Sequence, residues 1–187
     1  MNQSFEYINT YSKAIYNILE RMKNFKQIKY SNGNKTLHDI IYTVLSTMEI
    51  HQKGLFTYSL DNQLKDYKLA ENSLRNEDML NLFTNHVKNS LEANSTKINI
   101  NINHHLKSNI YIHIVDNGNG ISEKAIKKVY NPNFSTKAGN GDIRGVGMYL
   151  SKSLLQTVGG DEHIVESSIH GTVIELFFPV KSSKSLD

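Results

Sequence analysis

Two neighbouring segments in which isoleucine alternates with polar residues place the strongest constraint on the fold. They are KININI (97–102) and NIYIHIV (109–115), and a polar connection joins them. Alternation with a period of two is typical of a strand that buries one side and exposes the other. We therefore expect a β-hairpin that belongs to a sheet with one apolar face.

The segments around this hairpin have the periodicity of helices and of further strands. Apolar residues recur every three or four positions in four segments, which we interpret as helices: 4–29, 36–52, 76–93 (with Asn76 as its N-cap) and 148–158. Shorter alternating runs predict further strands at 55–60, 163–167 and 172–178. This order predicts an α+β fold, a two-layer sandwich of a mixed β-sheet covered on one face by α-helices and preceded by one long N-terminal helix.

Chain length and composition indicate one globular domain with an extension. The chain has 187 residues, of which 39% are hydrophobic and 21% charged. We divide it into an N-terminal helix (1–32), a main domain (33–181) and a disordered tail (182–187). It has no cysteine, no apolar run of the roughly 20 residues that span a bilayer, and no signal-peptide pattern. These features suit a cytoplasmic location, without membrane contact by this segment.

The net charge argues against one class of partner. It is only +3, and the lysines are scattered along the chain instead of clustered. A basic patch is the usual footprint of nucleic-acid binding. We therefore expect no nucleic-acid partner.

Glycine-rich segments follow the hairpin and point to an anionic ligand. DNGNG (116–120) follows the second strand directly, and RGVGMYL (144–150) leads into a helix. Glycines let the backbone approach a ligand closely, and a helix start presents free N–H groups to an anion. NFSTK (133–137), between them, supplies two hydroxyls and a lysine that suit phosphate oxygens.

Each of these motifs alone has a simpler interpretation. Asp-Asn-Gly is usually a turn, two glycines before a helix often form a plain loop, and asparagines along a helix are mostly a solvated face. The ordered set is much more specific than its members, because an Asn-rich helix, a strand, both glycine segments and the Phe-Ser-Thr-Lys run follow one another.

In this order the sequence resembles the catalytic and ATP-binding domain of sensor histidine kinases, within the superfamily shared with gyrase, MutL and the heat-shock chaperone ATPases. The resemblance covers residues 35–180. It rests on NHVKNSLEAN (85–94) as the N box, VDNGNGIS (115–122) as the first glycine box, NPNFSTK (131–137) as the F box, GDIRGVGMYLSKSLLQTVGG (141–160) as the second glycine box and GTVIELFFP (171–179) as the final strand.

The resemblance implies roles for the asparagines that recur every four residues in the helix 76–93. Asn89 would bind Mg²⁺ through its amide oxygen, and Asn85, one turn earlier, would face the same phosphates. Asn81, a further turn back, either belongs to this site or is purely structural. Related ATPases have a glutamate at the position of Asn85, and an amide cannot act as a general base. The domain is therefore expected to hold ATP without hydrolysing it rapidly.

The resemblance also assigns the adenine end of the nucleotide site. Asp116 would accept the exocyclic amine of adenine, while Gly118 and Gly120 would let the chain pass close to the base. Thr172 would support the adenine directly or through water.

At the phosphate end, the resemblance implies a lid and the start of a helix. Lys137 and Arg144 would neutralise phosphate charge and, with Asn85, act in catalysis, although Arg144 is equally well a plain surface residue. The other phosphate-facing residues would be Ser135, Thr136, Gly145, Val146, Gly147 and Met148. Met148 stands where leucine is common, a volume-conserving difference.

The implied function is transfer of the γ-phosphoryl group of ATP, with Mg²⁺, to a histidine. The segment 1–32 contains no histidine and resembles the end of a dimerisation helix. We therefore expect the acceptor on a histidine-bearing dimerisation domain outside this chain segment, a response regulator as the next partner, and a homodimer contact through the N-terminal helix. Two alternatives stay open: a serine kinase of the anti-sigma-factor type, and a non-catalytic module that binds a nucleotide or a partner.

Overall fold

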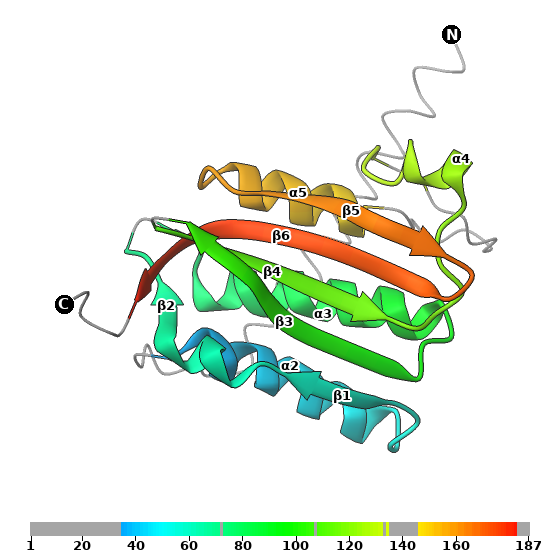
Figure 1. The fold of residues 1–187 in the computed structure, drawn as a ribbon, viewed down its shortest axis with the longest axis horizontal. Helices are drawn as coiled ribbons and strands as arrows, with labels where there is room; N and C mark the ends of the chain where they lie inside the picture. The colour runs from blue at the N-terminus through cyan, green and yellow to red at the C-terminus, as the bar shows by residue number, and fades with distance from the viewer. Residues whose placement is uncertain (1–34, 72, 107, 133, 135–145, 183–187) are drawn as a thin grey trace, which may run out of the picture.

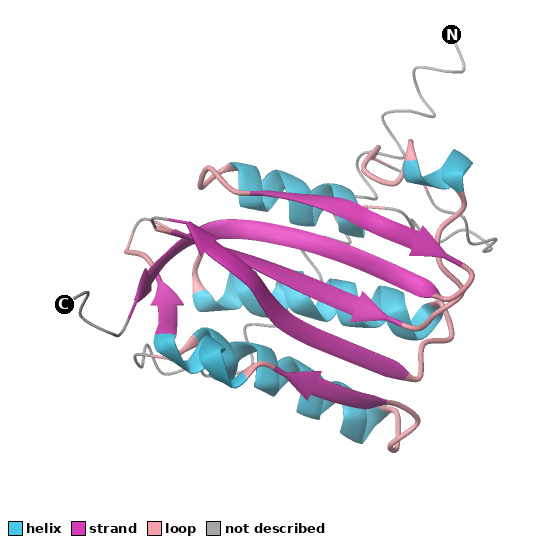
Figure 2. Cartoon of the chain, in the orientation of Figure 1, coloured by secondary structure: helices cyan, strands magenta, loops and turns pink. Residues whose placement is uncertain are grey.

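The computed structural model of the protein describes residues 35–71, 73–106, 108–132, 134 and 146–182. The predicted N-terminal helix lies outside this part of the chain. The described residues form an α+β fold with a mixed sheet and helices packed on it (Figures 1 and 2). This confirms the predicted fold class.

The sheet has six strands, and β6 is central to it. The order is β1, β3, β4, β6, β2, and β5 also pairs with β6. Only the pairing of β1 with β3 is parallel, and every other pairing is antiparallel. The strands are β1 (Thr57–Leu60), β2 (Tyr67–Leu69), β3 (Lys97–Leu106), β4 (Asn109–Asp116), β5 (Asp161–Ser168) and β6 (Gly171–Ser182).

The longer helices cover one face of this sheet, as Figure 1 shows. They are α2 (Leu37–His51), α3 (Asn76–Glu92) and α5 (Gly147–Gln156). Helix α3 packs between the other two. The described part of the chain also contains two short helical segments, η1 (Asn62–Asp66) and α4 (Glu123–Ile126).

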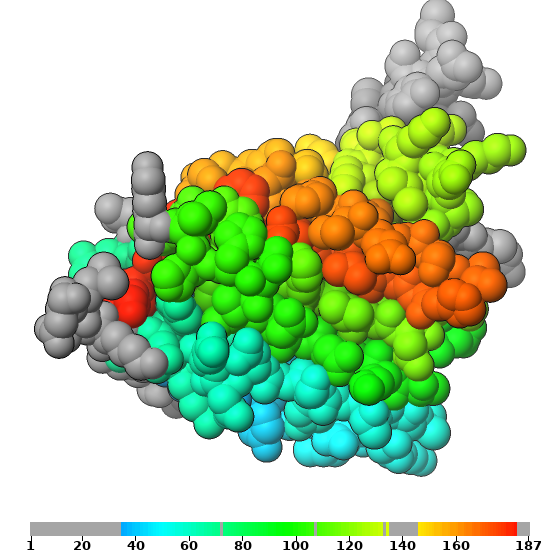
Figure 3. Space-filling model, viewed as in Figure 1, coloured from blue at the N-terminus to red at the C-terminus, as the bar shows by residue number. Residues whose placement is uncertain are grey.

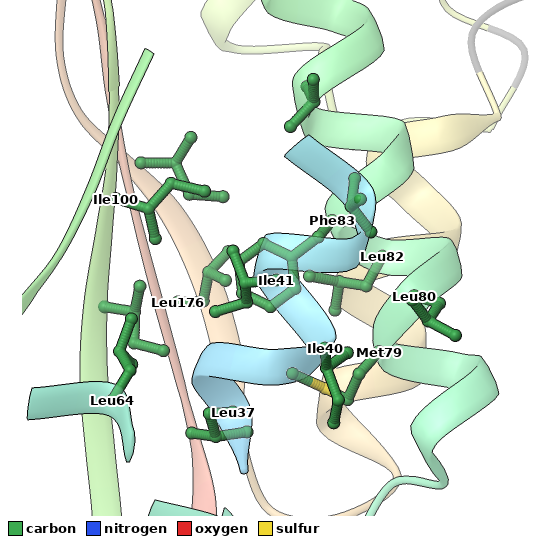
Figure 4. Packing of buried hydrophobic residues seen from close by; sticks show 14 of the residues in the cluster. Leu37, Ile40, Ile41, Leu64, Met79, Leu80, Leu82, Phe83, Ile100 and Leu176 are labelled. Atoms are coloured by element: carbon green, nitrogen blue, oxygen red, sulfur yellow. The ribbon is translucent and has the colours of Figure 1, made fainter. Parts of the chain in front are cut away.

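The core lies between the sheet and these helices (Figure 4). Alternate residues of each central strand point into it, among them Ile100 of β3, Ile112 of β4 and Leu176 of β6. Helices α2 and α3 add Ile41 and Phe83, both 0% exposed. The alternation in KININI and NIYIHIV therefore marks the buried side correctly, and the hairpin of β3 and β4 is confirmed.

Capping residues fix where α2 and α3 begin. Thr36 caps α2, because its hydroxyl accepts a hydrogen bond from the Asp39 N–H (3.2 Å) and the Asp39 carboxylate accepts one from the Thr36 N–H (3.0 Å). These hydrogen bonds hold the pKa of Asp39 below its ordinary value. The N-cap of α3 is Arg75, so the expectation of Asn76 was wrong by one residue. The Asp78 carboxylate accepts hydrogen bonds from the backbone N–H and the guanidinium of Arg75, which secures this start.

The sequence patterns missed the short elements and misjudged the end of β6. Strand β2 and helices η1 and α4 have 3 to 5 residues each, too few to produce a periodic pattern. Ser182, expected in the disordered tail, instead pairs with Tyr67 of β2. The partner strand supplies hydrogen bonds to this polar end of β6, and nothing in the local sequence signals that partner.

The opposite face of the sheet is not covered by the described helices and forms the surface nearest the viewer in Figure 3. Glu175 lies in β6 between Ile174 and Leu176, whose side chains are in the core, so its own side chain points to this opposite face. Its carboxylate accepts a hydrogen bond from the Asn103 amide (2.8 Å) and lies 2.9 Å from His113 Nε2 and 3.5 Å from His163 Nε2. This face therefore carries an ionisable cluster.

Candidate functional site

Asp116 and Thr172, predicted for the adenine end, lie opposite each other on paired strands. Asp116 is the last residue of β4, and Thr172 is the second residue of β6. Thr172 is 5% exposed. The antiparallel register thus brings together two residues that the resemblance assigned to one end of the site.

The carboxylate of Asp116 is held by a hydrogen bond at each oxygen. The Gly118 N–H donates to Oδ1 (2.8 Å), and the Ser90 hydroxyl of α3 donates to Oδ2 (2.8 Å). Hydrogen bonds to an ionised acceptor are stronger than those between neutral groups. Asp116 therefore has a defined orientation at the boundary between the sheet and α3.

The loop 116–120 is fastened to the end of α3 and the start of β3. The side-chain oxygen of Asn117 accepts hydrogen bonds from the backbone N–H groups of Thr96 (2.9 Å) and Lys97 (2.8 Å). The backbone N–H of Asn119 donates to the carbonyl of Ala93 (2.8 Å). The backbone of the first glycine segment is therefore fixed by the protein itself.

Gly120 meets a steric demand that no other residue type would meet. Its φ is +68°, and a Cβ at this position would overlap the backbone of Ser168 at the end of β5. Just beyond it, the Ser167 hydroxyl accepts a hydrogen bond from the Ile121 N–H (2.7 Å) and lies 3.0 Å from the Thr172 hydroxyl. Thr172 is thus joined to the loop through Ser167.

Asn85 of α3 lies against the start of α5, in the second glycine segment. Its Nδ2 donates to the Ser151 hydroxyl over 3.1 Å. A Cβ on Gly147 would overlap the Asn85 amide, so glycine allows the two helices this close approach. Val146 is the N-cap of α5. Met148 is 8% exposed and packs in the hydrophobic core, which leaves its backbone as the part that can face a ligand.

Asn89 lies one turn after Asn85 on α3 and is partly exposed. Among the described residues its amide has no hydrogen-bond partner, and the same holds for Asn81. Gly118 lies beside the end of α3, where a Cβ would come within 2.8 Å of the Ala93 carbonyl oxygen. The described members of the site therefore lie along one side of α3, from Asn85 to the first glycine segment.

Several predicted residues of the site lie outside the described part of the chain. They are the F-box and lid residues and the first glycine of the second box: Ser135, Thr136, Lys137, Arg144 and Gly145.

A buried polar group behind the site was not predicted. His86 of α3 and Glu162 of β5 are fully buried, with His86 Nε2 3.0 Å from the Glu162 carboxylate. Lys152 of α5 donates to the Glu162 carbonyl (2.7 Å), and its Nζ lies 4.6 Å from the centre of the Tyr130 ring. Burial, with a smaller effect of Glu162, raises the pKa of Tyr130. These contacts join α3, α5 and β5 at the back of the site.

The residues that hold the site in place also escaped the sequence analysis. Ser90, Asn117, Ser151 and Ser167 each bond to a residue distant in sequence. Serine and asparagine are common on helix surfaces and in turns. Only the register of the strands and the packing of the helices reveal their partners.

No group of three or more His, Cys, Asp or Glu side chains is arranged to hold a metal ion in the described ranges. Each helix of the described ranges is too short or too polar to cross a bilayer.

Comparison with known protein families assigns the domain. Residues 75–182 match the family described as histidine kinase-, DNA gyrase B- and HSP90-like ATPases. The match extends from the N-cap of α3 to the end of β6, and so includes Asn85, Asn89, Asp116 and Thr172.

Two curated relatives are named as kinases, one as a histidine-protein kinase and one as a probable sensor kinase. The chain is 26% identical over 182 residues to the signal transduction histidine-protein kinase AtoS of Escherichia coli (strain K12), covering 94% of this chain and 29% of AtoS. It is 29% identical over 109 residues to a probable C4-dicarboxylate sensor kinase of Halalkalibacterium halodurans, covering 56% of this chain and 20% of that protein. The chain thus spans less than a third of the length of either relative.

Solved structures share the fold. The catalytic domain of histidine kinase ThkA aligns with a TM-score of 0.62 and 22% identity over 78% of this chain and 93% of that one. Full-length ShkA in complex with AMPPNP aligns with a TM-score of 0.65 and 13% identity over 98% of this chain and 39% of that one. With the family match, these findings show that the chain belongs to the family of histidine kinase-, DNA gyrase B- and HSP90-like ATPases, with the fold of a histidine kinase catalytic domain.

Proposed function

We propose that this chain binds ATP and Mg²⁺ between α3, the loop 116–120 and the start of α5, and transfers the γ-phosphoryl group to a histidine on a separate helical domain. The observation that carries the proposal is the arrangement of the family motifs around α3. Asn85 and Asn89 lie along this helix, Asp116 lies across from Thr172, and Gly147 contacts Asn85.

Asp116 would read the adenine base. Its carboxylate is an acceptor at the end of a strand, so it suits the exocyclic amine of adenine and disfavours the carbonyl that guanine has there. Replacing it by asparagine removes the charge from this hydrogen bond. We expect Asp116→Asn to weaken ATP binding by roughly 1.5–3 kcal/mol.

Asn89 would provide the protein ligand for Mg²⁺. Mg²⁺ prefers oxygen ligands and usually takes only one or two from the protein, with phosphates and water as the others. The Asn89 amide suits this need, because it has no other partner among the described residues. When bound, the ion would neutralise negative charge on the phosphates.

Asn85 would leave water unactivated, so that hydrolysis of ATP does not compete with transfer to the histidine acceptor. Its amide cannot take a proton from water, and its Nδ2 is directed to Ser151. Slow hydrolysis would preserve the γ-phosphoryl group until an acceptor side chain arrives. By the family resemblance, the phosphates would also be held by Ser135, Thr136, Lys137, Arg144 and Gly145.

Partners are proposed from the family and the relatives. A histidine-bearing dimerisation domain would deliver the acceptor, and a response regulator would receive the phosphoryl group afterwards. Both assignments rest on the two curated relatives, which are named as a histidine kinase and a sensor kinase.

A binding titration followed by a transfer assay tests this proposal. ATP should bind more tightly in Mg²⁺ than in EDTA, and more tightly than GTP. Asn89→Ala should remove the benefit of Mg²⁺, whereas Asn94→Ala, an asparagine just beyond α3, should keep it. With γ-labelled ATP and a histidine-bearing helical hairpin added in trans, the hairpin should acquire acid-labile label.

Different failures would point to different errors. Absence of ATP binding would leave only a partner-binding module. Acid-stable label on an added protein would indicate a serine kinase. Full Mg²⁺ dependence in a correctly folded Asn89→Ala variant would remove Asn89 from the metal site.

A further inference from the structure

Ser90 occupies an unusual position for a serine inside a helix. It directly follows Asn89 on α3, is 4% exposed, and donates its hydroxyl to Asp116 Oδ2 over 2.8 Å. We propose that Ser90 is a positioning residue that sets the preference for adenine by fixing the carboxylate of Asp116. This inference rests on the proposed nucleotide site and concerns a residue within the N box (85–94) to which the sequence analysis assigned no role.

The direction of the Ser90 hydrogen bond is the first argument. A serine or threonine in the interior of a helix commonly donates to the carbonyl four residues earlier. Two residues of α2 do so: Thr43 donates to the Asp39 carbonyl and Ser46 to the Tyr42 carbonyl, both over 2.7 Å. Ser90 instead reaches a carboxylate 26 residues away in sequence.

The second argument concerns the lone pairs of the Asp116 carboxylate. An ionised carboxylate has about four acceptor sites on its two oxygens. The Gly118 N–H takes one on Oδ1, and the Ser90 hydroxyl takes one on Oδ2. With one donor on each oxygen the plane of the carboxylate is fixed, and two acceptor sites are left for a ligand.

Loss of the Ser90 hydroxyl would remove one of the two hydrogen bonds that orient the Asp116 carboxylate. Asp116 would keep only the hydrogen bond from the Gly118 N–H, which belongs to its own loop. The carboxylate could then rotate about its terminal bond, and the orientation needed for the exocyclic amine would have to be fixed at the moment of binding. That cost falls on ligands with an amine and spares those without one.

The position of Ser90 adds a link between the two ends of the site. Successive residues of a helix point about 100° apart, so Asn89 and Ser90 face different regions from one turn of α3. The proposed metal ligand and the residue that holds the adenine acceptor are therefore part of one rigid element.

Two nucleotides that differ only in the exocyclic amine test the inference. The unmutated chain should bind ATP more tightly than purine riboside triphosphate, which carries hydrogen in place of that amine. Ser90→Ala should weaken ATP by about tenfold, the size expected for one hydrogen bond to a charged group. The same change should alter binding of the analogue by less than about twofold.

The ratio of the two dissociation constants protects the test from folding effects, because partly unfolded protein lowers binding of both nucleotides alike. Ser95→Ala is the matched control: Ser95 is a serine with 5% exposure that bonds to the Lys97 carbonyl and to Asn117, not to Asp116. It should leave the ratio unchanged. In an Asp116→Asn background, Ser90→Ala should no longer affect the ratio.

The outcomes are separable from those of the proposed function. Equal weakening of ATP and the analogue by Ser90→Ala would reduce Ser90 to a packing residue, and unchanged affinity for both nucleotides would mean that Gly118 alone orients Asp116. Either result would overturn the inference while leaving ATP binding intact. If the unmutated chain does not prefer ATP to the analogue, Asp116 does not bind the exocyclic amine of adenine, and that part of the proposed function is wrong.

Discussion

The side-chain amide of Asn85 donates a hydrogen bond of 3.1 Å to the hydroxyl of Ser151, and this bond joins α3 to α5. Gly147, one turn earlier on α5, allows the contact by lacking a Cβ. Two motifs that are far apart in sequence therefore meet at one side chain. The identity of residue 85 should therefore decide whether ATP in the proposed site is hydrolysed by water.

The first prediction concerns hydrolysis by an Asn85→Glu variant. A carboxylate at this position can act as a general base, and the Ser151 hydroxyl, which accepts a hydrogen bond from the Asn85 amide, can instead donate one to the carboxylate. General-base catalysis typically contributes about 10²–10⁴-fold, and we expect at least about tenfold faster release of phosphate, because the longer side chain is crowded by Gly147.

Asn85→Gln is the control for this prediction, since it has the length of glutamate but no basic group. It should hydrolyse ATP no faster than the unmutated chain. Phosphate release is measured at saturating Mg-ATP after ATP binding has been verified. Normal binding without faster hydrolysis in Asn85→Glu would show that residue 85 does not reach the attacking water.

A second prediction separates two glycines with positive φ. Gly120 (φ +68°) and Gly159 (φ +77°) both have a left-handed backbone, but only Gly120 lies against another segment, at Ser168. Gly159→Ala should lower the free energy of unfolding by about 1–2 kcal/mol through backbone strain alone. Gly120→Ala should cost more, roughly 3 kcal/mol or above, because strain and steric overlap add.

Urea unfolding of both variants measures this difference. Similar losses in the two variants would indicate that the loop 116–120 moves away from Ser168 without cost. ATP affinity should fall in Gly120→Ala and stay unchanged in Gly159→Ala, because of the two glycines only Gly120 belongs to the proposed nucleotide site.

The sequence predicts most helices, strands and motifs. It does not predict contacts between residues that are far apart in the chain. The alternation of isoleucines identifies β3, β4 and their buried side, because burial of one sheet face imposes a period of two. The motif residues Asp116 and Thr172 come together because β4 and β6 are in register. That register is set by tertiary packing, and no local pattern records it.

The same reason explains the unpredicted residues. Ser90 and Ser151 are ordinary polar residues of amphipathic helices until their partners are known, and the pair of His86 with Glu162 joins α3 to β5 across the core. Strand β2, with three residues, is held by pairing with the end of β6 and not by its own propensity. The roles of the site residues stay predictions until nucleotide binding is measured.

A third prediction concerns the acid sensitivity of the sheet face opposite α2, α3 and α5. Burial of Glu175 raises its pKa, but hydrogen bonds from Asn103 and His113 and the nearby His163 outweigh this effect, and the pKa lies below its ordinary value of 4.5. A carboxyl group whose pKa is lowered by folding stabilises the protein above its unfolded pKa. That contribution is lost as the pH falls through the folded pKa.

Unfolding in urea at several pH values between 7 and about 3 checks this prediction, since that range spans the unfolded pKa of a carboxyl group. Glu175→Gln should destabilise the protein at pH 7, and the difference from the unmutated chain should shrink as the pH falls below 4.5. Glu71→Gln, with a side chain 89% exposed, should show a much smaller effect. A constant difference for Glu175→Gln at all pH values would mean that its ionisation is not coupled to folding.

The last prediction is that this chain alone does not phosphorylate its own histidines. All eight histidines are among the described residues. Each histidine other than His38 contacts another group through its ring or lies outside α2. His51 has its Nδ1 2.7 Å from the Thr47 carbonyl, and His104 stacks on Tyr111 at 4.0 Å between ring centres. The others are on strands, in the turn before β6 or buried on α3: His86, His105, His113, His163 and His170.

His38 is the one histidine with the sequence context of an acceptor, because it is on α2 and is followed by Asp39. The structure gives both residues other roles. The Asp39 carboxylate accepts hydrogen bonds from the N–H and the hydroxyl of Thr36, so it caps the helix. The His38 ring stacks on Tyr42, with 6.1 Å between ring centres and 8° between planes. Burial and the nearby Lys65 lower the pKa of His38, against a smaller effect of Asp39.

Incubation of the chain with γ-labelled ATP and Mg²⁺ tests this prediction, with acid treatment to separate phosphohistidine from phosphoserine. We expect no acid-labile label on the chain, although ATP binds. His38→Gln and His170→Gln should both behave like the unmutated protein, since neither side chain is expected to receive a phosphoryl group. Acid-labile label that disappears in His38→Gln but persists in His170→Gln would contradict the prediction and identify α2 as an acceptor helix. The His38 ring would then have to leave Tyr42 to reach the bound nucleotide.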